Sequence, residues 1–351
     1  MISSDDQSSV DMIRQSAGAI ASRKDLSRVR KLRFSSPGFD RKVWGEICEA
    51  GWPSLRVPED KGGVGMGLLP YCALMEELGA GLAPEPLIPA IFSASLLDGD
   101  ALEQQIRGER LILPAWQDAR DSLSIAKPLD VRGGRLTAVK RYVPGADGAD
   151  AFLVVGASQA AYVPADARGV EIASLEAQDG TRLATVSFHE VAVEPFDADP
   201  APGLAEAALA TSAYLLGLMD AALDLTVDYL KTRVQFGKAI GGFQALQHMA
   251  VDAKLEVELT RASVEDAAIQ WDLVGPTPSA HAAVSRAKAR ASQAAMKVTR
   301  DAIQMHGGIG FTDEHDIGLY LRKAVVVVSQ FGSAKAHRAH FAELKPARLE
   351  A

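Results

Sequence analysis

Two blocks of sequence decide the fold: Arg233-Val-Gln-Phe-Gly237, and the later Ala302-Ile-Gln-Met-His-Gly-Gly-Ile-Gly-Phe311. The first block follows a stretch in which apolar residues between Tyr214 and Tyr229 recur every three or four positions, as on one face of a helix. A second such helix follows the block, and Pro276 and Pro278 precede a third helix of roughly 25 residues. Long helices with short connections predict a four-helix bundle over residues 199–351.

The sequence before these helices has two further textures. Residues 108–198 contain short β-type runs separated by glycine turns, which predict a β-barrel-like domain. Residues 1–107 read as helices broken by glycine and proline, which predict an N-terminal helical domain. Strands and helices do not alternate, so a Rossmann sheet is excluded. The predicted fold class is α+β, with three domains at 1–107, 108–198 and 199–351.

Composition narrows the class of protein. The formal charge of −8 argues against a general partner for nucleic acid or for membrane surfaces. Cys48 and Cys72 are the only cysteines, which excludes a disulfide framework and a cysteine metal cluster. The polar, acidic start lacks the pattern of a signal peptide, and no long uncharged apolar run predicts a membrane span. We expect a cytoplasmic protein without a metal site.

The two blocks carry groups that suit a phosphorylated ligand. Arg233 offers a fixed cationic fork that matches a diphosphate. Gly307 and Gly308 let a ligand approach the backbone without a Cβ in the way, and the amide of Gln304 can donate and accept. Each feature alone has a simpler explanation, since an arginine can cap a helix and two glycines can form a plain turn. Taken alone, each feature therefore favours the simpler explanation over a ligand.

The two blocks resemble the C-terminal domain of the acyl-CoA dehydrogenases, and the resemblance extends over nearly the whole chain. It implies three domains and an FAD whose diphosphate and adenosine part is held across a subunit interface. By position in the family's motifs, the residues implied to contact FAD are Arg233, Gln235, Phe236, Gln244, Gln304, Gly307 and Gly308.

The catalytic base of the family is missing from its usual place. Most members carry a glutamate after the last long helix, where this chain reads Ser329-Gln-Phe331-Gly-Ser333. The phenyl ring of Phe331 cannot take a proton. A minority of members place the glutamate early in the first C-terminal helix, at a position that falls on Ala207 here. Glu206 is one residue away and is a weak candidate; Glu314 and Asp118 are further candidates.

The middle domain also departs from the family. The family's glycine-rich loop over the flavin corresponds here to residues 115–122, which contain no glycine. A Trp-Ile-Thr segment that packs on the flavin ring corresponds to Tyr142-Val-Pro144. Proline has no backbone N–H to offer a flavin oxygen. The flavin-ring pocket of this chain therefore looks impaired, whereas its cross-interface half looks intact.

This asymmetry is similar to the base-lacking small subunits of heteromeric acyl-CoA dehydrogenases, of the pimeloyl-CoA and steroid side-chain type. It implies an FAD-dependent α,β-dehydrogenation of an acyl-CoA thioester by a heterotetramer, with an electron-transferring flavoprotein as acceptor. One competing hypothesis is a homomeric dehydrogenase with a displaced base. Two more are a non-catalytic structural subunit, and a flavin oxidase or monooxygenase on the same fold.

Overall fold

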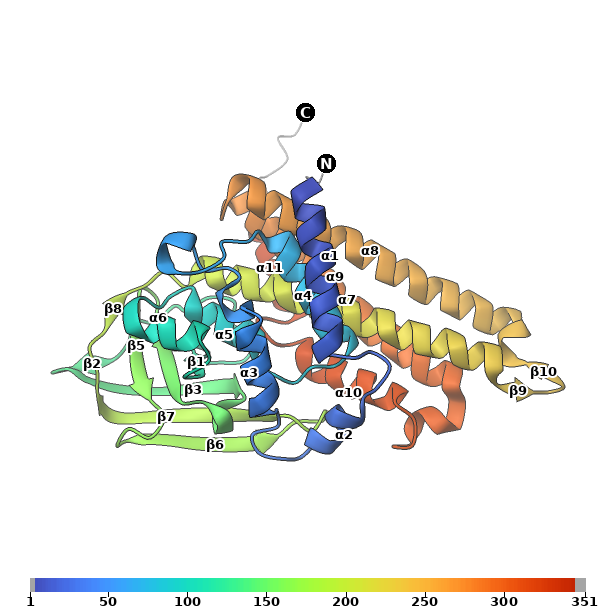
Figure 1. The fold of residues 1–351 in the computed structure, drawn as a ribbon, viewed down its shortest axis with the longest axis horizontal. Coiled ribbons are helices and arrows are strands. Elements are labelled where there is room, and N and C mark those ends of the chain that lie inside the picture. Colours follow the sequence, from blue (N-terminus) through green and yellow to red (C-terminus); the bar gives the residue numbers. More distant parts are fainter. Residues whose placement is uncertain (1–3, 345–351) are drawn as a thin grey trace. The chain divides into compact units, whose positions relative to one another are not determined.

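A computed structural model describes residues 4–344 and forms two compact units, each built from several segments of the chain (Figure 1). The bundle unit comprises the residues up to Ser27, Leu68–Ala83 and the chain from Ala208 onward. The sheet unit comprises Arg28–Gly67 and Pro84–Ala207. Because both units draw on distant segments, the linear division at residues 107 and 198 remains a prediction.

The bundle unit is helical apart from one short hairpin. Three long helices, α7, α8 and α9, make up most of it. Its elements are α1 (Ser4–Ile20), α4 (Leu68–Ala80), α7 (Ala201–Thr232, in this unit from Ala208), β9 (Val234–Gln235), β10 (Lys238–Ala239), η4 (Ile240–Gly242), α8 (Gln244–Val274), α9 (Pro278–His306), η5 (Gly307–Phe311), α10 (Ile317–Val327) and α11 (Ala334–Leu344).

Helix α9 forms where the sequence predicts its start, and it lies at the centre of the bundle. The Thr277 side chain accepts a hydrogen bond from the N–H of Ala280, and Pro278 occupies the first turn, where its missing N–H costs nothing. The small residues on one face of α9 are almost fully buried, which lets neighbouring helices approach closely. These residues are Ala283, Ala287, Ala291 and Ala294.

Helices α4 and α7 cross at two glycines. A Cβ at Gly217 of α7 would overlap the carbonyl oxygen of Glu76, and a Cβ at Gly79 of α4 would overlap that of Tyr214. By length and mean hydropathy, α7 passes a test for a membrane-spanning helix, but 83% of its apolar stretch is buried inside the protein. It is therefore a core helix whose second apolar face packs on α4.

The sheet unit combines short helices with two four-stranded sheets. Its helical elements are α2 (Ser27–Leu32), α3 (Arg41–Glu49), η1 (Trp52–Ser54), η2 (Glu59–Lys61), α5 (Leu87–Ala94), α6 (Gly99–Ile106) and η3 (Ala146–Gly148). Its strands are β1 (Ile112–Ala115), β2 (Val131–Arg132), β3 (Arg135–Pro144), β4 (Ala151–Val155), β5 (Gln159–Pro164), β6 (Val170–Glu176), β7 (Arg182–Ala192) and β8 (Phe196–Asp197).

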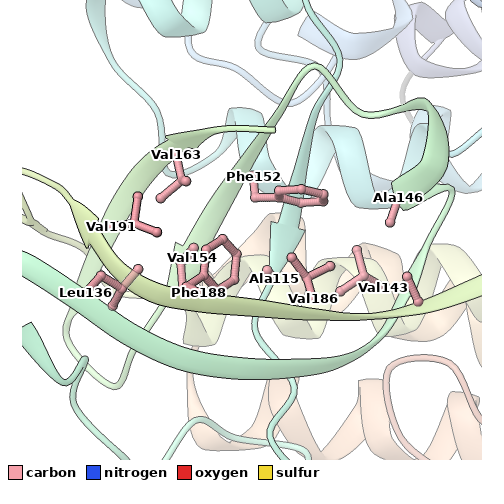
Figure 2. Close-up of a cluster of buried hydrophobic side chains, with 11 residues drawn as sticks. Ala115, Leu136, Val143, Ala146, Phe152, Val154, Val163, Val186, Phe188 and Val191 are labelled. Atoms are coloured by element: carbon pink, nitrogen blue, oxygen red, sulfur yellow. The ribbon is translucent and has the colours of Figure 1, made fainter. Parts of the chain in front are cut away.

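The two sheets share one apolar core (Figure 2). One sheet has the strand order β1-β4-β5-β8 and the other has β2-β3-β7-β6. Phe152 of β4 and Phe188 of β7 meet edge to face, with ring centroids 6.1 Å apart. The prediction of a barrel-like domain needs correction, because in the described residues no ladder of hydrogen bonds joins one sheet to the other. The α+β fold class is confirmed, with two facing sheets in place of a closed barrel.

Candidate functional site

A tight hairpin carries the first block of predicted FAD contacts. Strand β9 pairs with β10 around a two-residue loop, Phe236-Gly237, and both loop residues have positive φ, 53° and 78°. Such a loop matches the twist of a two-stranded ribbon. A left-handed backbone costs a phenylalanine about 1 kcal/mol, and the Phe236 side chain is 90% exposed. A large apolar ring left so exposed on a strained backbone suits contact with another molecule.

The second block lies where α9 ends. Gly307 adopts a φ of 66°, and its N–H donates to the carbonyl oxygens of Gln304 and Ile303, which ends the helix. Gln304, Gly307 and Gly308 are all exposed. The turn continues into η5, which presents Phe311 with 77% of its surface exposed.

Three aromatic rings join the two blocks. Tyr229 of α7 stacks on His306 of α9, with ring centroids 4.4 Å apart and planes 22° apart. His315 lies 4.6 Å from the His306 ring and 5.8 Å from the Tyr229 ring, centroid to centroid. Burial lowers the pKa of His306 to about 4, so the stacked imidazole is uncharged at neutral pH. The structure thus brings the two blocks, about 70 residues apart in sequence, to one end of the bundle unit.

The beginning of α8 supports the hairpin from the other side. Phe236 meets the ring of Phe243 edge to face at 6.1 Å, and the Lys238 ammonium lies 4.1 Å from the centroid of the same ring. The N–H of Ile240 donates to the carbonyl oxygen of Arg233 at 2.8 Å. Gln244, the first residue of α8, is exposed beside this contact. All seven predicted FAD contacts therefore lie on the surface of one unit.

The exposed groups fit the diphosphate and adenosine part of FAD. In the described chain, the Arg233 guanidinium and the Gln244 amide have no hydrogen-bond partner, so both are available to a ligand. A Cβ at Gly308 would meet no atom within 4 Å, and φ at this position is not positive. Since neither packing nor backbone geometry within the chain requires this glycine, the space beside it suits a molecule that approaches from outside.

Helix α8 has a second apolar face that points away from the bundle. Val251, Leu255 and Leu259 are 54–58% exposed, and at 100° per residue they share a face with Gln244. The opposite face, with Val257 and neighbouring residues, is buried. An exposed apolar stripe of this kind is typical of a surface that another protein covers.

At the position where most family members carry the catalytic glutamate, Phe331 lies in a turn whose backbone is held by side-chain hydrogen bonds. Phe331 is buried and has a φ of 52°. His337 Nε2–H donates to the carbonyl oxygen of Phe331 at 2.8 Å, and Lys288 Nζ donates to those of Gly332 and Val328 at 2.8 and 3.0 Å. Two basic side chains thus fix the backbone of the turn, and both are engaged with its carbonyl oxygens.

Burial explains the charge state of these two side chains. Lys288 is completely buried, which lowers its pKa from 10.5 to about 7. Burial, with a smaller contribution from Lys288, lowers the pKa of His337 to about 3. The imidazole is therefore neutral, and its Nδ1 lies 3.2 Å from the Ser285 hydroxyl.

Glu206, the weak candidate for a displaced base, is already engaged. Its Oε1 and Oε2 accept hydrogen bonds from Arg56 at 2.6 and 2.9 Å, and both side chains are about 15% exposed. Arg56 also donates to the carbonyl oxygen of Met66. Both oxygens of this carboxylate are thus occupied by the arginine fork, which leaves neither free to approach a substrate proton.

Asp118 and Glu314 are the remaining carboxylates considered as a base. Asp118 is paired with a lysine, and Glu314 lies on the surface. The Asp118 carboxylate accepts from Lys140 at 2.7 Å, and Lys140 also donates to the carbonyl oxygens of Trp116 and Val155. This buried lysine ties residues 116–118 to β3 and β4. Glu314 is exposed, and its N–H donates to Thr312.

One groove of the bundle unit lies apart from the predicted FAD contacts. An open groove of about 750 Å³ lies between α8, α9 and α11 and is lined by Arg286, Arg290, Lys297 and Arg338 among others. None of the seven predicted contacts lines it. Over residues 4–344, no group of three or more His, Cys, Asp or Glu side chains is placed to hold a metal ion.

Local sequence patterns did not identify Lys288 as a hydrogen-bond partner of the turn around Phe331. The signal was present, because Lys288 stands four residues from both Val284 and Ser292 on the buried face of α9. A charged residue on such a face requires partners.

Tyr229 fitted the pattern of a core residue, and only the distance to His306 reveals its link to the second block.

Comparison with known proteins identifies relatives along most of the chain. Residues 7–98 match the acyl-CoA dehydrogenase N-terminal domain, and residues 201–343 match the acyl-CoA dehydrogenase C-terminal domain. Acyl-CoA dehydrogenase IpdE2 of Mycobacterium tuberculosis is 32% identical over 324 residues, which cover 89% of this chain and 90% of that protein. Acyl-CoA dehydrogenase FadE27 of the same organism is 28% identical over 332 residues, or 87% and 88% of the two chains.

Solved structures agree with the fold. A variant of the steroid ACAD Tcur3481–Tcur3483 has 27% identity and a TM-score of 0.85 over 97% of both chains. The ChsE4–ChsE5 complex from Mycobacterium tuberculosis gives a TM-score of 0.85 over 99% of both chains at 23% identity, which is a likeness of fold.

Proposed function

The chain belongs to the acyl-CoA dehydrogenase family, and we propose that it is the base-lacking subunit of an FAD-dependent acyl-CoA dehydrogenase. In this proposal it pairs with a second chain of the family in a heterotetramer. It completes the FAD site of that partner, and the partner supplies the carboxylate base. The observation that carries the proposal is the buried Phe331 at the position of the family's base, in a chain whose seven predicted FAD contacts are all exposed.

The proposed contacts divide the ligand between them. Arg233 would pair with the FAD diphosphate through its guanidinium fork. Gln244 and Gln304 would exchange hydrogen bonds with the polar groups of the nucleotide, and Phe236 would shield it from water. Because Gly307 and Gly308 have no side chains, FAD could come within hydrogen-bonding distance of their backbone. FAD, when bound, supplies the acceptor for the hydride that leaves the β-carbon of the substrate.

This chain contributes binding and positioning to the reaction, and not proton transfer. Removal of the α-proton needs a general base within hydrogen-bond reach of that proton. Phe331 has no such group, Glu206 is held by Arg56, and Asp118 is held by Lys140. The proton therefore goes to a carboxylate of the partner chain in the proposed complex.

The substrate is proposed to be the CoA thioester of a fatty acid or of a steroid side chain. The steroid class is supported by the resemblance to the steroid ACAD Tcur3481–Tcur3483 at 27% identity. An electron-transferring flavoprotein would accept the electrons, and the complex would work in the cytoplasm.

The flavin content of the chain, alone and in its native complex, tests the proposal. The chain is produced alone in a heterologous host, and a tagged copy is purified from its native host with the proteins that accompany it. We expect the lone chain to be colourless. We expect the native complex to contain a second acyl-CoA dehydrogenase chain, identified by mass spectrometry, and one FAD per pair of chains.

Three outcomes would contradict the proposal. A lone chain that binds one FAD per copy and oxidises an acyl-CoA would be a homomeric dehydrogenase with a displaced base. A native complex without flavin would be a structural assembly. A complex that consumes oxygen instead of reducing an electron-transferring flavoprotein would indicate an oxidase or monooxygenase.

A further inference from the structure

The geometry points to Tyr229, His306 and His315 as positioning residues that hold the two FAD-contact segments of this chain at a fixed spacing. We call these three side chains the ring stack. The inference rests on the proposed function, because it concerns how the FAD-contact surface is assembled. None of the three rings is itself proposed to touch FAD.

Two of the rings adjoin the segments directly, and the third packs against both of these rings. The N–H of Arg233 donates to the carbonyl oxygen of Tyr229 at 2.9 Å, so the ring-bearing turn of α7 is the turn that ends at the hairpin. His306 immediately precedes Gly307 and Gly308. His315 lies in the loop after η5, and its Nδ1 accepts from the N–H of Ile317 at 3.2 Å.

The ring stack is the polar and aromatic link between the segments. Among residues 4–344, no hydrogen bond or ion pair directly joins residues 233–240 to residues 304–311. The stacked contact of Tyr229 and His306, at 4.4 Å, bridges them instead. A flat stack limits both the separation and the tilt of its two supports, which a contact between flexible aliphatic chains would not do.

Histidine at position 306 has a cost that its role in orientation explains. The side chain is 4% exposed, and its Nε2 has no hydrogen-bond partner among the described residues. A leucine would fill similar space without a stranded nitrogen. His306 Nδ1–H, however, donates to the carbonyl oxygen of Ala302 at 2.8 Å, which fixes the plane of the ring on α9. A fixed plane is what a stacked spacer needs.

Three variants test the inference in the native complex. Tyr229→Leu keeps an apolar side chain of similar length in the helix but removes the flat ring, and Tyr229→Phe keeps the ring. His315→Leu removes the third ring from a half-buried loop position, where the helices are not disturbed. His281→Ala is the matched control, because it removes a histidine that meets Trp271 edge to face at 5.0 Å. That pair lies about 38 Å from His306 along α9, at about 1.5 Å per residue.

The readouts are the dissociation constant for FAD, measured by flavin fluorescence after removal and titration of FAD, and the thermal unfolding midpoint. A stacked pair is worth up to about 1.5 kcal/mol beyond its buried area. We therefore expect Tyr229→Leu to raise the dissociation constant about tenfold, at about 1.4 kcal/mol per factor of ten. His315→Leu should raise it by less. Tyr229→Phe and His281→Ala should leave it within about twofold.

The outcomes separate this inference from the proposed function. If the wild-type complex holds FAD and a folded Tyr229→Leu complex binds it as tightly, the ring stack is not a positioning device. The same holds if Tyr229→Phe binds FAD as poorly as Tyr229→Leu. If Tyr229→Leu does not fold, an unchanged affinity in His315→Leu overturns the role of the stack. A wild-type complex without FAD instead overturns the proposed function, and the inference with it.

Discussion

Lys288 is a buried hydrogen-bond donor to the Phe331 turn. Its amine donates to the buried carbonyl oxygen of Gly332 and to the half-buried one of Val328, which also accepts from the Ser292 hydroxyl. An acceptor left unsatisfied in such a place costs about 1–3 kcal/mol. The amine meets this need while its own burial disfavours the charged form.

This arrangement predicts that the contribution of Lys288 to stability depends on pH. The unfolded chain keeps the lysine proton up to about pH 10.5, whereas the folded chain releases it above about pH 7. The unfolded state therefore binds more protons in this window, and stability rises with pH across it. Lys288→Met should lower the free energy of unfolding by about 1–3 kcal/mol at pH 9, and by less at pH 6. Urea denaturation at both values measures the difference.

Thr299→Val is the control for Lys288→Met. It removes a buried polar group from the same helix, a hydroxyl that donates to the carbonyl oxygen of Ala295, and it does not titrate. Its effect should be the same at both pH values. An equally constant effect of Lys288→Met would show that the buried amine does not change its charge on folding.

Glu206 gives a second prediction at this scale. Glu206→Gln replaces one partner of a partly buried ion pair with Arg56, so we expect the free energy of unfolding to fall by about 1–3 kcal/mol. The turnover of the native complex should stay within about twofold of wild type, since the carboxylate is not the base. Steady-state kinetics measure it. A loss beyond about a hundredfold, with the substrate KM unchanged, would identify Glu206 as the displaced base.

At the scale of the elements, two glycines in the bundle unit differ in the space beside their Cα atoms. Gly217 lies where α7 crosses α4, and a Cβ there would overlap the backbone of Glu76. A Cβ at Gly308 would meet open space. One glycine serves the packing of two helices, and the other is proposed to serve a molecule outside the chain.

The two glycines therefore predict opposite outcomes for the same substitution. Gly217→Ala should lower the free energy of unfolding by about 3 kcal/mol or more, because the helix crossing must open. Gly308→Ala should change it by no more than about 0.5 kcal/mol, yet weaken FAD binding in the complex about tenfold. Thermal unfolding and flavin titration of both variants measure this. Unchanged FAD affinity in Gly308→Ala would remove this turn from the binding surface.

The helices of the bundle were more predictable from sequence than the strands. The apolar period and the Pro276 and Pro278 break predicted α9, which runs from Pro278 to His306. Strand β6 escaped prediction because none of its side chains is fully buried and its apolar residues are spread over both faces. Strand β3 was hidden by charged residues such as Lys140, whose partners come from distant segments.

At the scale of the whole molecule, the predicted FAD contacts form an exposed surface and do not line the open groove between α8, α9 and α11. The predicted FAD contacts, the outer face of α8 and the hairpin ring are all exposed in one unit. The types of residue at this surface could be recognised in the sequence, because they stand in two compact blocks. The pairing of Arg56 with Glu206 could not, since 150 residues separate the partners.

The outer face of α8 predicts the effect of a charge on assembly. Leu255→Glu places a carboxylate in the middle of the exposed apolar stripe and should prevent the pairing of this chain with its partner, with loss of FAD. Leu175→Glu is the matched control, because Leu175 is 77% exposed on β6 in the sheet unit. Light scattering and flavin absorbance of the purified complexes measure both effects. Intact, flavin-loaded Leu255→Glu complexes would place the interface elsewhere.

The exposed Phe236, Phe311 and Leu255 side chains have a consequence for gene dosage. A surplus of this chain over its partner would leave these apolar groups uncovered, and such surfaces promote aggregation. A surplus of the partner would leave FAD sites without their second half. Under the proposed assembly, balanced synthesis is thus a physical requirement of the fold, and a cell meets it most simply by transcribing both genes together.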